Sequence, residues 1–101
     1  IQITGPCTLA AGVEKPKGDR ILSDVGARRD LAQALAAAAA THIADVRRRL
    51  PNATLLVQID EPALPAVMSG QVPTASGFHR HRSVDAPLAS AGFEPILAAV
   101  A

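Results

Sequence analysis

The 101-residue chain has no tryptophan or tyrosine, only two phenylalanines and a single cysteine, Cys7. One cysteine excludes both an internal disulfide and a cysteine-rich zinc site, and this usage is typical of a reducing, cytoplasmic setting. Apolar residues make up 49% of the chain. Because alanine supplies much of that fraction, the sequence predicts a core that is poor in large side chains.

Long apolar runs and an excess of charge are also missing. No stretch reaches the roughly 18 apolar residues of a membrane span, and the N-terminus lacks the zones of a signal peptide. The net charge of +1 argues against nucleic acid as a partner, because phosphate binding needs a concentrated basic face. The only basic run, Arg47–Arg49, is explained more simply as a solvated helix end, where cations are favoured.

Strand-like and helix-like patterns alternate along the chain. Residues 24–50 carry one apolar stripe at helical spacing, formed by Leu31, Leu35, Ala39, Ile43, Val46 and Leu50. Residues 54–60 are almost continuously apolar or β-branched, which is the pattern of a parallel strand buried on both faces. The predicted order is strand 1–4, loop 5–23, helix 24–50, strand 54–60, loop 61–84 and helix 85–101.

A strand, a long helix and a second strand form a parallel crossover unit. A complete (β/α)₈ barrel needs about 250 residues. We therefore expect a segment of such a barrel, with about two to three βα units, or else a small open α/β unit. The chain starts on Ile1, which suggests a processed chain or a piece of a longer one. An isolated segment would expose strand edges, so we expect either self-association through them or a partly rearranged fold.

Two short motifs follow the predicted strands: TGPCT at residues 4–8 and DEPAL at residues 60–64. In parallel α/β folds, ligands bind at the carboxyl ends of the strands, so both motifs would open on one face. Asp60 and Glu61 are adjacent and would point to opposite sides. One acid could bind an ammonium group or orient a metal-bound group. Alternatively, Asp60 caps backbone N–H groups and Glu61 pairs with Arg20 or Arg82.

The strings ITGPCTLA at 3–10 and VQIDEPAL at 57–64 resemble the catalytic domain of cobalamin-independent methionine synthase. The resemblance implies zinc-dependent methyl transfer to the thiol of homocysteine, which gives methionine. It further implies that Asp60 binds the amino group of the substrate and that Glu61 supports the site. The adjoining wall would be formed by Thr4, Gly5, Pro6 and Thr8.

Two residues that serve the folate in the long enzymes of this family are replaced here. Gly12 stands where those enzymes have a tryptophan, and Ala66 stands where they have a glutamate. The missing contacts argue against a folate donor, and the chain is more similar to the short, single-barrel relatives, some of which take the methyl group from a corrinoid carrier. The resemblance therefore implies a methyl-folate or a methyl-corrinoid as the donor. The resemblance places the zinc ligands beyond residue 101, so the segment alone is expected to be inactive. The alternatives are a corrinoid-linked or other thiol methyltransferase and a non-catalytic α/β interaction fragment.

The histidines and the cysteine are explained by structural positions, without a metal-binding or catalytic role. His79 and His81 stand two apart in HRHR, but no cysteine or acid lies at ligand spacing, so no metal site is expected within the segment. His42 lies beside the apolar stripe of the helix and fits a packed or surface position. Cys7 is expected to be a small buried residue, the alternative being a reactive thiol with a lowered pKa.

Overall fold

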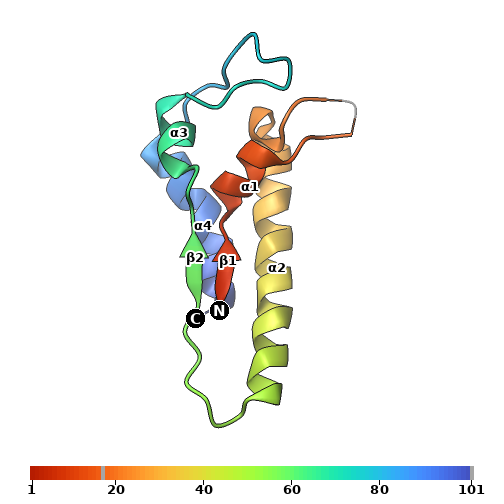
Figure 1. The fold of residues 1–101 in the computed structure, drawn as a ribbon, viewed down its shortest axis with the longest axis vertical. Coiled ribbons are helices and arrows are strands. Elements are labelled where there is room, and N and C mark those ends of the chain that lie inside the picture. Colours follow the sequence, from red (N-terminus) through yellow and green to blue (C-terminus); the bar gives the residue numbers. More distant parts are fainter. Residues whose placement is uncertain (17, 101) are drawn as a thin grey trace.

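One long helix sets the shape of the molecule, which measures 51 × 27 × 19 Å. The structure is a computed structural model that describes residues 1–16 and 18–100. Helix α2 (Val25–Arg49) has 25 residues and is therefore about 38 Å long (Figure 1). It begins at Asp24, whose Oδ1 accepts the N–H of Ala27 at 3.1 Å. It ends just before Pro51, which cannot continue a helix.

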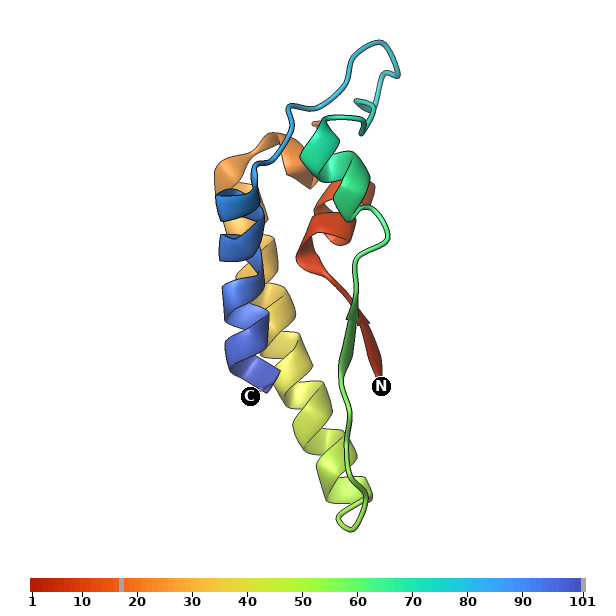
Figure 2. The ribbon, with the colours of Figure 1, turned by 90° about the vertical axis from the view of Figure 1, so that its left-hand side faces the viewer.

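Two short parallel strands lie beside this helix. Strand β1 (Gln2–Thr4) pairs with β2 (Gln58–Asp60) in the register Gln2–Gln58, Ile3–Ile59 and Thr4–Asp60. The other elements are the helices α1 (Pro6–Gly12), α3 (Leu64–Ser69) and α4 (Ala86–Val100), together with a 3₁₀ turn, η1 (Ile21–Ser23). Figure 2 shows α2 and α4 side by side, with the strands in a separate layer.

The prediction of a segment of a (β/α)₈ barrel is wrong. The described residues form a helix-dominated fold with only two strands, each three residues long, and β2 is followed by two helices rather than by a third strand. The predicted strand 54–60 is paired only from Gln58 onward. A parallel strand that is buried on both faces lies inside a sheet whose two faces are covered by helices. Within the described residues β2 has one neighbour, and the ladder stops where β1 begins.

Two helices lie inside segments that were expected to be loops. Helix α1 and η1 fall within 5–23, and α3 falls within 61–84. Pro6 and Pro65 both stand in a first helical turn, where the missing N–H is tolerated. Gly70 ends α3 with φ +72°, a left-handed conformation that glycine adopts without strain.

Helix α4 runs without a break through Gly92 and Pro95. Pro95 lies well inside this helix, which matches the predicted range 85–101. A proline in this position leaves the carbonyl group of Ala91 without its helical partner. Packing against α2 therefore outweighs the cost of the proline.

Alanines, rather than leucines, face the inside of α2. The buried residues of this helix are Ala32, Ala36, Ala39 and Ile43, whereas Leu31 and Leu35 are only half-buried and Leu50 is 58% exposed. The buried stripe is thus rotated by one position from the predicted one over its first half. Alanine lets α4 approach closely, and Ile96 of α4 packs onto Ala36 and Ala39. Within the described residues, no helix combines the length and apolar character needed to cross a membrane.

Candidate functional site

The two motifs after the strands are joined by hydrogen bonds. The N–H of Gly5 donates to the carbonyl oxygen of Asp60 at 2.8 Å. The N–H groups of Cys7 and Thr8 donate to the two carboxylate oxygens of Glu61 at 3.1 and 2.9 Å. In return, the N–H of Ala63 donates to Oγ1 of Thr8 at 3.1 Å. Residues more than fifty positions apart in the sequence therefore form one unit at the end of the sheet.

Gly5 is required by the close approach of Glu61. A Cβ atom at Gly5 would lie 2.4 Å from both Cδ and Oε1 of Glu61, well inside van der Waals contact. The bulk of any other side chain would displace the carboxylate from the N–H groups of α1. The glycine of the TGPCT motif thus has a structural role, which is to leave space for the Glu61 carboxylate.

The adjacent acids have different surroundings. Glu61 is half-buried and binds the first turn of α1, so its charge is committed to the backbone. Asp60 is also half-buried, and its Oδ1 accepts a hydrogen bond from Nε2 of Gln58 at 2.5 Å. Among the described residues, no cation forms an ion pair with Asp60. The capping role considered for Asp60 therefore falls to Glu61, and the Asp60 carboxylate has only an amide beside it.

The remaining wall residues lie around this unit. Thr4 is exposed at the end of β1, directly opposite Asp60 in the register. Gly5 and Pro6 are buried, and Thr8 is half-buried on α1. Neither Arg20 nor Arg82 pairs with Glu61, and Nη1 of Arg20 donates instead to the carbonyl of Ala11 at 2.7 Å.

Cys7 lies on the inner side of α1 and is 9% exposed. Burial, together with the hydrogen bond and the negative charge of Glu61, raises the pKa of its thiol to about 12. Arg28 opposes this shift but does not cancel it. The thiol stays protonated at neutral pH, which makes it a poor nucleophile.

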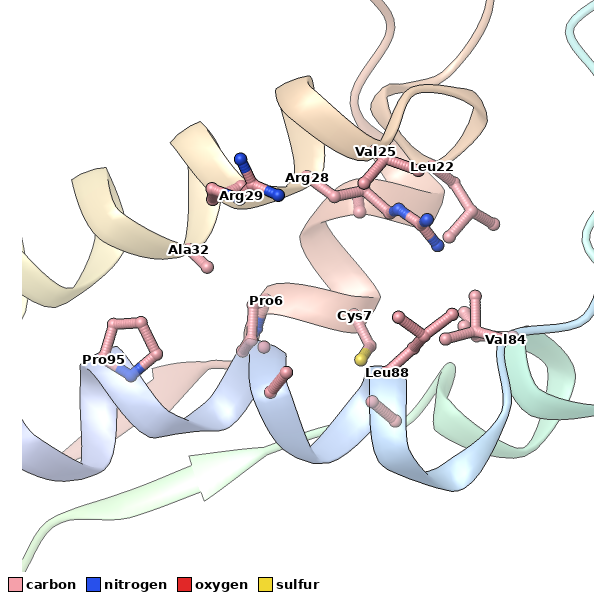
Figure 3. A pocket seen from close by; sticks show the side chains of 15 residues that line it. Pro6, Cys7, Leu22, Val25, Arg28, Arg29, Ala32, Val84, Leu88 and Pro95 are labelled. Carbon is pink, nitrogen blue, oxygen red and sulfur yellow. The ribbon is translucent and has the colours of Figure 1, made fainter.

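A cavity of about 180 Å³ opens behind α1, between α2 and α4 (Figure 3). Its walls include Pro6 and Cys7, but not Asp60 or Glu61. This cavity and the two arginines that line it, Arg28 and Arg29, were not predicted from the sequence. The sequence did contain a signal for this site. Arginines near the start of a helix interact unfavourably with the helix dipole, so their presence there indicates another role.

The described residues contain no group of three histidine, cysteine, aspartate or glutamate side chains that could hold a metal ion. His79 and His42 are exposed. His81 is buried, with its Nε2 3.3 Å from Oδ1 of Asp19 but outside hydrogen-bonding geometry. Asp19 also accepts the N–H groups of Arg20 and Ala75, which holds the pKa of its carboxyl below the usual range. These contacts tie the loop before η1 to the loop after α3.

Comparison of the chain with protein-family models, curated proteins and solved structures gives no significant match.

Proposed function

We propose that residues 4–8 and 60–64 form the substrate-binding part of a thiol methyltransferase, in which the Asp60 carboxylate binds the ammonium group of homocysteine. The observation that carries this proposal is the different use of the two adjacent acids. Glu61 is held by the backbone of α1 and stabilises the site, whereas Asp60 has no cationic partner among the described residues. An ammonium group is the natural partner of such a carboxylate.

The scaffold around Asp60 supports the same role. The carbonyl oxygen of Asp60 is fixed by Gly5, and the carboxylate oxygens of Glu61 are fixed by Cys7 and Thr8. A carboxylate at the end of a strand is positioned more rigidly than one on a free loop, so less entropy is lost when it binds a ligand.

The residues described here do not supply a zinc site, because no suitable group of ligands occurs among them. No catalytic step is therefore assigned to a metal in this chain. The resemblance carried by the two motifs implies that the methyl donor is a methyl-folate or a methyl-corrinoid. Gly12 and Ala66, which replace the expected folate contacts, are exposed and half-buried respectively.

Titration calorimetry with homocysteine tests directly whether the Asp60 carboxylate binds the ammonium group. The Asp60→Ala variant should bind homocysteine roughly 10- to 100-fold more weakly, because it loses one charged hydrogen-bond partner. Asp45→Ala is the matched control, since Asp45 pairs with Arg48 and Arg49 far along α2. The control should leave the affinity unchanged.

A second ligand separates the ammonium contact from general damage to the site. 4-Mercaptobutanoate has the thiol and carboxylate of homocysteine but lacks its amino group. It should bind the wild-type chain more weakly than homocysteine does. The Asp60→Ala variant should bind 4-mercaptobutanoate as tightly as the wild-type chain does. No measurable binding of homocysteine by the wild-type chain, or an equal loss in the Asp45 variant, would contradict the proposal and favour the non-catalytic alternative.

A further inference from the structure

The cavity behind α1 has an apolar interior and a charged edge. Its walls come from four helices and the loops beside them, and the apolar residues among them include Leu22, Ala32, Val67, Val84, Leu88 and Ala89. Two large apolar side chains of this wall remain exposed to water, Val25 at 57% and Leu88 at 53%. A ligand that covers them would gain apolar burial that the empty chain lacks.

The charge at this edge is positive. Figure 3 shows the side chain of Arg28 reaching from α2 toward Leu88 and Val84, with Arg29 one position further along the helix. No carboxylate of residues 1–16 or 18–100 forms an ion pair with either arginine. The nearest acid in sequence is Asp30, which directly follows Arg29, and Asp24 caps α2 with its Oδ2 3.8 Å from Nζ of Lys15. The edge of the cavity is thus complementary to an anion.

The size of the cavity limits the ligand. Cavities of about 150 Å³ with purely apolar walls bind benzene. A space of about 180 Å³ therefore accommodates one aromatic ring with a short side chain.

We propose that this cavity is a binding site for a small arylalkyl carboxylate, whose ring fills the space between α2 and α4 and whose carboxylate binds Arg28. This site is separate from the one proposed at Asp60, because Asp60 and Glu61 do not line the cavity. The protonated thiol of Cys7 forms part of its neutral wall and takes no covalent part.

The test is an NMR titration of the ¹⁵N-labelled chain with three ligands of matched shape. These are 3-phenylpropionate, its neutral amide and 3-phenylpropylamine. The carboxylate should bind about tenfold more tightly than the amide, and the amine should bind most weakly. The largest shifts should fall on the backbone amides of Cys7, Ala32 and Ala89, which surround the cavity.

Two variants separate the charge from the cavity. Arg28→Gln should weaken 3-phenylpropionate about tenfold and leave the amide unchanged. Arg47→Gln makes the same change in net charge on the same helix, at a position remote from the cavity, and should change neither affinity. Ala32→Leu fills the cavity and should abolish binding of all three ligands while the helical circular-dichroism spectrum persists.

Three results would overturn the proposal. The first is an absence of saturable binding of 3-phenylpropionate at millimolar concentration to the folded wild-type chain. The second is an equal affinity for the carboxylate and the amine. The third is an equal effect of Arg28→Gln and Arg47→Gln, which would show that only net charge matters.

Discussion

The helix pair α2–α4 is closed at one end and open at the other. At the closed end, Ile96 packs onto Ala36 and Ala39 and is only 1% exposed, with Ile3 and Ile59 of the strands beside it. At the open end, Arg28 and Ala32 of α2 face Leu88 of α4 across the cavity. The two ends belong to the same two helices and differ in what lies behind them.

Small side chains pack well only when something large fills the space that they leave. Behind the closed end, the strands supply two isoleucines. Behind the open end, α1 presents Pro6, Cys7 and Ala10, none of which is large enough to reach across. An alanine-rich seam therefore gives close packing at one end and a cavity at the other.

The largest expected effect is at the closed end. Ile96→Ala should lower the free energy of unfolding by about 2–5 kcal/mol, because it removes a fully buried side chain and leaves a void. Leu97→Ala is the matched control, since Leu97 is 54% exposed and should cost less than about 1 kcal/mol. Urea unfolding followed by circular dichroism measures both changes. Equal losses would show that the closed end is not tightly packed.

The second effect concerns the junction of the two motifs. Gly5→Ala should cost about 1–3 kcal/mol, because the added Cβ overlaps the Glu61 carboxylate. In Glu61→Ala the space is free, so adding Gly5→Ala to that variant should cost clearly less. A double-mutant cycle measured by urea unfolding gives the coupling between the two positions. Strict additivity would contradict the close contact between them.

The third effect depends on pH and on Cys7, which lies between the junction and the cavity. Its pKa is raised to about 12 from 9.0, so the folded chain holds this proton more tightly than the unfolded chain. The stabilisation is complete below pH 9 and is lost as the pH rises toward 12. Stability should fall by about 1 kcal/mol by pH 10.

The matched variant for this effect is Cys7→Ala, which has no thiol to titrate. Its stability should show a smaller decline than the wild type between pH 9 and pH 12, when both are followed by urea unfolding at several pH values. Parallel pH profiles for the two chains would mean that the thiol titrates at an ordinary pKa in the folded state.

The smallest expected effect is the loss of stability on replacing Phe78, compared with the loss on replacing Phe93. Phe78 is 86% exposed, so Phe78→Ala should change the free energy of unfolding by less than about 0.5 kcal/mol. Phe93 is half-buried against the apolar cluster around Cys7 and Val67, and Phe93→Ala should cost clearly more. Thermal unfolding of the two variants ranks them, and a larger loss for Phe78 would contradict this placement.

Local signals anticipated part of this structure and part of the candidate site. The long helix was visible in the apolar stripe over residues 24–50. The meeting of TGPCT with DEPAL followed from the expectation that both motifs end parallel strands, and the register places Thr4 opposite Asp60. Helix α1 was missed, because Gly5-Pro6 is a turn signal when it is considered without the Glu61 carboxylate that caps the helix.

The sequence by itself indicated the long helix α2, the last helix α4 and the paired strand ends, because periodicity and prolines act within a few residues, but it did not indicate α1 or α3. Tertiary structure alone decided which acid supports the fold and which remains available, since Asp60 and Glu61 are chemically similar neighbours. It also decided that the α2–α4 seam is closed at Ile96 and open at Arg28. The physical reason is that burial and the hydrogen bonds of a carboxylate depend on groups that the chain brings together only when it folds.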